Sequence, residues 1–440
     1  MSHLSFASRQ FGMGPAAAPP APAPLPLPAP GSITAVVGAS GAGKTRALAR
    51  LAQSAGARLC KPLTRQQLAR PVLSLFPVSM AGGVVLRALA QCGLADATIW
   101  RRRAHTLSAG EQRRLELALA TACSAKPSRC QVPVIVDEFD AHLDGETALC
   151  LAASLARLAA AQRLQLVIST HRPECLGALN AKRVFEIDGE NARELPAPRP
   201  RDLLAEISIE RGSLADYARF ARWHYLGSRR PGPVSDVFVA RFQGRAIAVA
   251  TFGPTHLFLS PRNAALPKFS SVVVSRNGAK ALNAHVRLLQ RVVVEPRFRA
   301  LGVASQLLKA ALPQLGVRYV ECLAEMGQFC GFLERAGFER KDRCKLSREA
   351  ARLSQTLMRL GLRPQSLLNP RNRRRVLARL TCEDREKIER QLIGLCRSRI
   401  ETGAGRLRGR RVAPEALLQR ALLRLHCQPE YFLWSSHESL

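Results

Sequence analysis

"ITAVVGASGAGKT", residues 33 to 45, joins a short apolar run to a glycine-rich turn that ends in a lysine and a threonine. The apolar run before the turn and the helical pattern after it predict a strand, a loop and a helix. In that setting glycines let backbone N–H groups turn inward around phosphate, Lys44 can reach the outer phosphates, and the Thr45 hydroxyl can hold Mg²⁺. The sequence therefore predicts a phosphate-binding loop made of Gly38, Ala39, Ser40, Gly41, Ala42, Gly43, Lys44 and Thr45.

A second apolar run, "VPVIVDE" at residues 132 to 138, ends in the acidic pair Asp137 and Glu138. One carboxylate at the end of a buried strand can orient Mg²⁺ and its water, and a second can polarise an attacking water. The alternative is a strand capped by two solvated acids, and the phosphate loop argues against it. Asp137 and Glu138 are therefore predicted to face the phosphate loop.

Between these runs lies "TLSAGEQRR", residues 106 to 114. Ser108 followed three residues later by Glu111 is the pattern of a capping box that starts a helix. The open N-terminus of such a helix also suits the binding of a phosphate group. The segment alone does not distinguish a simple helix start from a nucleotide-binding one.

These segments, in this order and followed by "VISTHRPE" at 167 to 174, resemble the ATP-binding-cassette ATPases over residues 32 to about 190. The resemblance implies that Lys44 and Thr45 contact the phosphates and magnesium. It also implies that Asp137 contacts magnesium, that Glu138 activates water and that His171 is a switch near the γ-phosphate.

The resemblance further implies a homodimer with a shared site. Ser108 and Gly110 would reach the γ-phosphate bound by a second copy, and Asp144 would lie on a dimer-facing loop. Either Gln66 or Gln67 would sense the nucleotide, and the sequence does not choose between them.

The sequence departs from this family in two places. Only 70 residues separate Gly38 from Ser108, so we expect a trimmed version of the helical region that docks onto membrane domains in transporters. The strands and the adenine-stacking aromatic residue that precede the phosphate loop in the family have no clear counterpart. A Pro/Ala tract occupies that place, and Phe11 is a candidate for stacking on adenine.

A second α/β pattern begins after the proline-rich break at residues 195 to 202. In it, "RVVVEPRFRALGVASQLLKAAL" (291 to 312) reads as a strand, a basic loop and a helix, and "FLERAGF" (332 to 338) follows. Together they resemble the GNAT acetyltransferase superfamily over residues 205 to 345. The resemblance implies that the pantetheine of an acyl-CoA lies along Val292, Val293 and Val294. It places the pyrophosphate on Arg299, Ala300, Leu301, Gly302, Val303 and Ala304.

The segment "RWHYLGSRRPG", residues 222 to 232, contains His224 next to Tyr225. A histidine can act as a base and a tyrosine as an acid, although an amphipathic helix end with aromatic packing has the same pattern. His-Tyr at this place is similar to the phage Mom family of DNA-modifying enzymes. That resemblance makes His224 and Tyr225 candidate catalytic residues, with an additional metal near His224 as an open alternative. At the position of Leu333, many GNAT enzymes have the tyrosine that protonates the departing thiolate, so the general acid is unassigned here.

The charge of the chain is its outlying property. Among 440 residues, 66 Lys and Arg against 33 Asp and Glu give a net charge of +33, which favours a polyanionic partner. Arginine-rich coding bias is the alternative explanation. The candidate phosphate contacts are Arg371, Arg373, Arg374, Arg375, Arg408, Arg410 and Arg411.

We therefore expect an α/β protein in four parts. They are an N-terminal Pro/Ala-rich arm (1–31), an ATP-binding-cassette-type P-loop ATPase domain (32–200), a GNAT-like α/β domain (201–345) and a basic helical C-terminal extension (346–440). The 12 scattered cysteines favour reduced thiols in a cytoplasm, and we expect no membrane-spanning segment.

The leading hypothesis is an enzyme that uses ATP, Mg²⁺ and acetyl-CoA or another acyl-CoA to modify a base in nucleic acid, with DNA as the first choice of substrate and ATP-driven dimerisation controlling access. RNA, and a protein or small-molecule acceptor, are alternatives; a transporter ATPase subunit is a further one.

Overall fold

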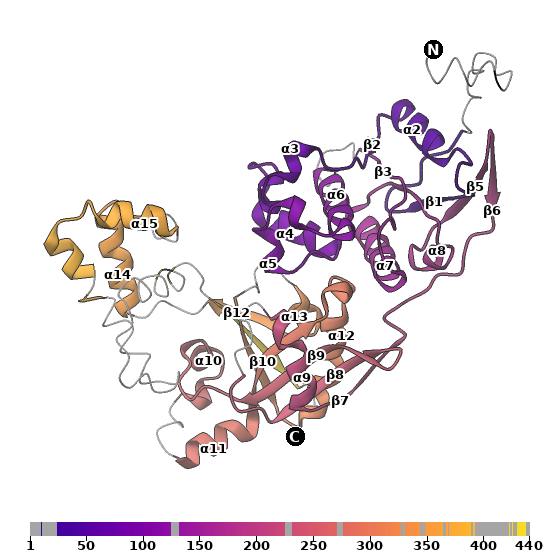
Figure 1. The fold of residues 1–440 in the computed structure, drawn as a ribbon. Helices are drawn as coiled ribbons and strands as arrows, with labels where there is room; N and C mark the ends of the chain where they lie inside the picture. Colours follow the sequence, from indigo (N-terminus) through magenta and orange to yellow (C-terminus); the bar gives the residue numbers. More distant parts are fainter. Residues whose placement is uncertain are drawn as a thin grey trace.

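The computed structural model describes Gln10 and residues 24–124, 132–224, 231–270, 276–325, 327, 331–343, 348–363, 367, 369–388, 390–391, 422, 425 and 429–436. Its two sheets are built from separate parts of the chain, and Figure 1 shows the helices that surround each of them. The protein has the mixed α/β architecture that the sequence predicts.

The first sheet has six strands in the order β2-β3-β4-β1-β5-β6. Their bounds are β1 Ile33–Val37, β2 Arg58–Leu59, β3 Val134–Val136, β4 Leu166–Ser169, β5 Arg183–Asp188 and β6 Asn191–Leu195. Strands β2, β3, β4, β1 and β5 pair in parallel, and only β6 is antiparallel to its neighbour. The carboxyl ends of β1, β3 and β4 therefore meet at one edge, where the phosphate loop and the acidic pair begin.

Helices cover this sheet on both faces, as expected of parallel strands that are buried on both sides. They are α2 Lys44–Ser54, α3 Arg65–Leu68, α4 Gly82–Gln91, α5 Ala97–Trp100, α6 Ala109–Ser124, α7 Gly145–Gln162 and α8 Glu174–Ala178. Much of α7 is buried, because small and apolar residues surround its whole circumference. We call this part of the chain, residues 32–200, the first unit.

The second sheet has seven strands in the order β12-β13-β11-β10-β9-β8-β7. Their bounds are β7 Ile207–Arg211, β8 Asp236–Phe242, β9 Arg245–Pro254, β10 Val286–Val294, β11 Tyr319–Ala324, β12 Glu339–Arg343 and β13 Glu430–Ser435. All neighbours are antiparallel except β10 and β11, which are parallel. We call this sheet and its helices the second unit.

Strands β10 and β11 pair over a short distance only. Their register covers Val286–Leu288 with Tyr319–Glu321, whereas β10 continues to Val294 and β11 to Ala324. The register of β10 against β9 also shifts between Leu289 and Arg291. A bulge bends a strand, so this shift accounts for the divergence of β10 from β11.

Helices α9 Leu214–Phe220, α10 Ser260–Ala265, α11 Arg276–His285, α12 Val303–Ala311 and α13 Phe332–Arg335 pack around the second sheet. The strand, basic loop and helix predicted within residues 291–312 are found as the end of β10, the turn after it and α12. Figure 1 shows α7 of the first unit on the side nearest α12 and α13, and the buried apolar residues of both units form one continuous cluster.

The C-terminal part differs from the expected helical extension. Helices α14 Arg348–Arg359 and α15 Pro370–Leu377 are present, but residues 430–435 form β13, which lies between β11 and β12 in the second sheet. Tyr431, Phe432 and Leu433 are buried there. The second unit therefore takes a strand from beyond residue 345, and the predicted boundary at that residue is wrong.

The end of the N-terminal arm also packs against the first unit. Leu25 is buried among residues of β1, α2 and β5, and Gln165 donates a 2.6 Å hydrogen bond to the Pro28 carbonyl. Phe11 lies outside the described residues.

Candidate functional site

The phosphate loop runs from the end of β1 to the start of α2. Gly38, Gly41 and Gly43 have φ values of 144°, 81° and 93°, a region that favours glycine. A side chain on Gly38 would place its Cβ 2.5 Å from the Ile187 carbonyl oxygen. The buried Lys44 donates from Nζ to the carbonyls of Gly38 and Ala39, each at 2.8 Å. The loop thus curls around its own lysine.

The fold brings Thr45, the last residue of the phosphate loop, next to Asp137, the residue that follows β3. The Thr45 hydroxyl donates to Asp137 Oδ2 at 2.6 Å, and Ser169 Oγ donates to Asp137 Oδ1 at 2.5 Å. Hydroxyl and carboxylate oxygens are the ligands that Mg²⁺ prefers. Thr45 and Asp137, the residues predicted to hold magnesium, therefore fit that ion. Ser169 holds the Asp137 carboxylate in place.

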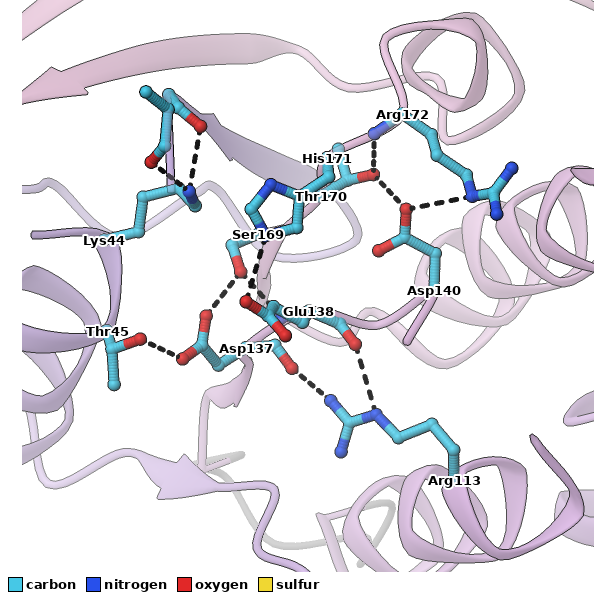
Figure 2. A network of polar contacts seen from close by, with 12 residues as sticks. Lys44, Thr45, Arg113, Asp137, Glu138, Asp140, Ser169, Thr170, His171 and Arg172 are labelled. Atoms are coloured by element: carbon cyan, nitrogen blue, oxygen red, sulfur yellow. Dashed lines mark hydrogen bonds and ion pairs between the residues drawn. The ribbon is translucent and has the colours of Figure 1, made fainter. Parts of the chain in front are cut away.

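Glu138 lies next to His171. His171 Nε2 and Glu138 Oε1 are 2.9 Å apart, and about half of the Glu138 side chain is exposed, at 50%. Glu138 has a φ of 46°, and its N–H donates to Ser169 Oγ at 2.7 Å. Figure 2 shows the Glu138 carboxylate between the imidazole and the Asp137 side chain. Solvent therefore reaches a carboxylate held beside Thr45 and Asp137, the candidate magnesium ligands.

Arg113, which the sequence analysis did not identify, supports this acidic pair from below. Its guanidinium donates to the backbone carbonyls of Asp137 and Glu138 and pairs with Glu116 at 3.0 Å. Glu116 also accepts from the N–H of Leu63 at 3.0 Å. An arginine in a helix usually faces solvent, and only its place directly after the "LSAGEQ" segment could have singled it out.

A second group missed in the sequence joins the segment after Glu138 to the segment after β4. Thr170 donates to Asp140 Oδ2 at 2.7 Å, and Arg172 donates to the Leu143 carbonyl at 2.9 Å. Arg172 Nε also lies 3.7 Å from Asp140. Figure 2 shows the contacts of Asp140 with Thr170 and Arg172 beside His171. The histidine and the loop that leads to Asp144 are therefore held as one piece.

Gln66 and Gln67 both lie in the short helix α3. Gln67 completes a capping box, because its Oε1 accepts from the Thr64 N–H at 2.9 Å and its own N–H donates to Thr64 Oγ1 at 3.2 Å. The Gln66 side chain is exposed. Neither glutamine has a hydrogen bond to the phosphate loop in the part of the chain that the structure describes.

Ser108 and Gly110 lie at the start of α6, and the predicted capping box is present. Glu111 accepts from the Ser108 N–H at 2.9 Å, and Ser108 Oγ accepts from the Glu111 N–H at 3.2 Å. Ser108 is exposed. Asp144 caps α7 by accepting from the N–H and hydroxyl of Thr147. Among the described residues, no hydrogen bond or ion pair joins Ser108, Gly110 or Asp144 to the phosphate loop of the same chain.

In the second unit, His224 follows the 3₁₀ turn Ala221–Trp223 and faces the β10 residue Arg291, with Arg291 Nη1 at 3.4 Å from Nε2. Burial, helped by Arg291 and Arg299, lowers the pKa of His224 to about 4. A cationic neighbour opposes a metal ion, and the described residues contain no group of three His, Cys, Asp or Glu suited to one. Among the described residues, the surroundings of His224 therefore offer no such set of metal ligands. Tyr225 lies outside the described residues.

Val292, Val293 and Val294 lie on β10 beyond its pairing with β11, and Arg299 to Ala304 form the turn into α12. Gly302, with a φ of 98°, is the N-cap of α12. The Arg299 side chain is committed elsewhere, because it donates to the carbonyls of Val294, Ala95 and Trp223 at 2.9 to 3.0 Å.

The basic residues of α15 divide into two groups. Arg371, Arg374 and Arg375 are exposed, whereas Arg373 is 2% exposed and donates to the Leu367 carbonyl. Arg373 is therefore a structural residue rather than a phosphate contact. Arg408, Arg410 and Arg411 lie outside the described residues.

Comparisons with known proteins give one kind of match. No protein-family model and no curated protein matches the sequence. Among solved structures, a nucleotide-free ATP-binding cassette from an ABC transporter is 14% identical, covers 38% of this chain and 82% of that chain, and has a TM-score of 0.31. A dimeric ATP-binding cassette in a post-hydrolysis state, bound to ADP and Pi, is 17% identical over 40% of this chain and 88% of that chain, with a TM-score of 0.31.

A third solved structure, an RNase-L inhibitor, is 19% identical, covers 42% of this chain and 39% of that chain, and has a TM-score of 0.30. In the part of the chain that the structure describes, no helix is both long and apolar enough to cross a membrane.

Proposed function

We propose that the first unit binds Mg²⁺–ATP and hydrolyses it. The observation that carries the proposal is the 2.6 Å contact between Thr45 and Asp137, which joins the phosphate loop to the acidic strand end. Magnesium, when bound, supplies charge neutralisation at the phosphates. Lys44 exchanges its two carbonyl partners for phosphate oxygens, and Glu138 orients and polarises the attacking water.

His171 and Ser169 position this chemistry. His171 holds one oxygen of Glu138 at 2.9 Å, which leaves the other oxygen for a water, and Ser169 fixes both Asp137 and the Glu138 backbone. Gln67 is engaged in its capping box, so we assign the nucleotide-sensing role to Gln66, whose side chain is exposed.

Equilibrium dialysis of the full chain with ATP and Mg²⁺ tests the proposal. Lys44→Ala removes the phosphate-binding amine and is expected to weaken binding by at least about tenfold, the loss of a charge-assisted contact. Arg50→Ala, on an exposed face of α2, is the matched control and is expected to bind like the wild type. Equal binding by wild type and Lys44→Ala would place the nucleotide elsewhere.

We also propose that two copies share the nucleotide. The exposed N-terminus of α6 and the exposed Asp144 lie on the same unit as the phosphate loop without contacting it. An exposed helix N-terminus attracts a phosphate group. The nucleotide bound by a second copy is the simplest source of that phosphate. ATP-dependent dimerisation then controls how the second unit meets its substrate.

For the second unit we propose acyl-CoA-dependent transfer to a base in nucleic acid. The divergence of β10 from β11 supports it, because the backbone of residues 292–294 can then pair with an extended, amide-bearing chain such as pantetheine. The N-terminus of α12 supports a pyrophosphate site, held by backbone N–H groups and not by the Arg299 side chain. Arg157 of α7 lies beside it, with Nη2 3.2 Å from where a Cβ on Gly302 would be.

His224 is the proposed base of this reaction. Its lowered pKa keeps the imidazole neutral, and therefore able to accept a proton, at pH 7. Mass spectrometry of nucleosides from cells that overproduce the protein is expected to show a heavier base, which disappears in His224→Ala and persists in His105→Ala. An unchanged nucleoside profile together with acylated protein would instead indicate a protein acceptor, and modified RNA alone would indicate RNA.

Nucleic acid is the proposed polyanionic partner. Arg371, Arg374 and Arg375 are three and four residues apart on a helix, so they share one face of α15. All three are exposed. A row of guanidinium groups on one helix face suits the spacing of backbone phosphates better than diffuse charge does.

A further inference from the structure

The segment Glu295–Arg299 of the second unit contacts the first unit in two places, at the start of α7 and at the loop that joins α4 to α5. Contacts anchor both ends of the segment. Arg297 binds Glu146 at the start of α7, and Arg299 binds the α4–α5 loop at Ala95. A small cavity lined by residues of α6, α7 and the loop after α4 lies beside Arg297.

The first anchor is a closed ring of four charges. Glu146 of α7 accepts from Arg245 and from Arg297, each at 2.5 Å, through different oxygens. The same two arginines also bind the two oxygens of Glu295, which is 5% exposed on its side chain. Four mutually bridging groups, of which only Glu295 is nearly buried, are hard to separate one at a time. This ring therefore fixes the second unit to α7.

The second anchor leads to His224. Arg299 donates to the Ala95 carbonyl of the first unit at 2.9 Å and to the Trp223 carbonyl at 3.0 Å. Trp223 directly precedes His224, and Arg299 also donates to Val294 at the end of β10. One planar guanidinium thus joins the first unit to the backbone that presents the His224 imidazole.

The α4–α5 loop is tied in turn to the nucleotide site by helix α6. Arg114 of α6 donates to the Gly93 carbonyl at 2.8 Å, two residues before Ala95. The preceding residue, Arg113, binds the carbonyls of Asp137 and Glu138. Adjacent arginines of one helix therefore hold the acidic pair on one side and the α4–α5 loop on the other.

We propose that Arg299 is a positioning residue that couples nucleotide binding in the first unit to the placement of His224. The inference rests on the proposed binding of ATP. A movement of α6 when nucleotide is bound shifts the α4–α5 loop and with it Arg299, while the ring on α7 stays fixed. Because Arg299 bridges three carbonyls, the displacement reaches the Trp223–His224 backbone and changes the exposure of the imidazole.

The test measures the reaction of His224 with diethyl pyrocarbonate in the full chain, with and without AMP-PNP and Mg²⁺. Neutral imidazole attacks this reagent, and peptide mass spectrometry gives the rate at His224. We expect the nucleotide to change that rate by at least about fivefold in the wild type, the lower end of usual coupling between two sites. In Arg299→Lys, whose single amine cannot bridge three carbonyls, we expect the rate to be the same with and without nucleotide.

Two further variants complete the test. Arg241→Lys alters an arginine of β8 that pairs with Glu210 inside the second unit, and it is expected to behave like the wild type. Arg114→Gln cuts the link at α6 without altering the second unit, and it is expected to lose the response as Arg299→Lys does. Arg114→Gln carries the test alone if Arg299→Lys does not fold.

Dialysis with AMP-PNP on the same samples separates the outcomes. Unchanged nucleotide affinity with a lost response in both variants supports the coupling. If the wild type binds AMP-PNP but His224 reacts at the same rate with and without it, the coupling is overturned and the ATP site stands. The same holds if Arg299→Lys and Arg114→Gln keep the wild-type change in rate. A wild type that does not bind AMP-PNP overturns both proposals.

Discussion

The hydroxyl of Thr45 lies 2.6 Å from Oδ2 of Asp137, although 92 residues separate them in the chain. The parallel pairing of β3, β4 and β1 brings their carboxyl ends together and thereby creates this contact. The contact joins Thr45, which follows Lys44 in the phosphate loop, to Asp137, the first residue of the acidic pair.

Asp137→Asn is expected to reduce Mg²⁺-dependent ATP turnover by about 100-fold or more, because a neutral amide is a poorer magnesium ligand than a carboxylate. Asp188→Asn, at the exposed end of β5, is the control and should retain turnover. Steady-state phosphate release measures both. Full activity in Asp137→Asn would mean that Asp137 does not hold the metal.

Arg113→Met is expected to destabilise the protein by about 2–3 kcal/mol, because it leaves two backbone carbonyls without their donor and Glu116 without its ion pair. ATP turnover should fall as well, since Asp137 and Glu138 lose their support. Urea unfolding measures the first effect. Arg101→Met, at an exposed position, should change stability by less than about 0.5 kcal/mol, and an equal loss in both variants would argue against a specific role.

The second sheet should show a pH-dependent stability that originates in Glu321. Burial raises the pKa of this carboxyl from 4.5 to about 7, although Arg262 and the Tyr431 hydroxyl oppose the rise. The native state then binds the proton more tightly than the unfolded chain, so Glu321 contributes stability at low pH that is lost as the pH rises through 7.

Glu321→Gln removes this titration. The unfolding free energy of the wild type minus that of the variant should therefore fall between about pH 5 and about pH 8, measured by urea titration followed through tryptophan emission. A difference that is constant or rises with pH would contradict the assignment.

Replacing Arg371, Arg374 and Arg375 together with Gln is expected to weaken DNA binding and to reduce the slope of log K against log salt by about 2.7, since each lost phosphate contact contributes about 0.9. Arg183, Arg193 and Arg201, each paired with a carboxylate, give a control triple variant with the same loss of charge. Equal slopes in the two variants would mean that net charge alone drives binding. Fluorescence anisotropy over a salt series measures the slopes.

The nucleotide motifs could be predicted from the sequence because their chemistry is local. The turn at residues 38–44 needs glycine at the three positions where φ is positive. Apolar strand ends position Asp137 and His171 at one edge of the sheet. Local patterns likewise predicted the strand, turn and helix that lead from β10 into α12.

What the sequence did not disclose depends on contacts between distant segments. Arg113 and Arg299 look like ordinary basic residues until the fold surrounds each with backbone carbonyls. The buried Arg373 looked like a phosphate contact for the same reason. Strand β13 was missed because its partners, β11 and β12, lie about 100 residues earlier in the chain.

The most direct test of the ATPase is the turnover of Glu138→Gln. With the carboxylate that polarises water replaced by an amide, hydrolysis should fall by about 100-fold or more, while equilibrium dialysis should show retained ATP binding and light scattering an ATP-dependent dimer. Glu186→Gln, on β5 and paired with Arg193 at the surface, should hydrolyse ATP like the wild type. Hydrolysis by Glu138→Gln at the wild-type rate would contradict the proposed site.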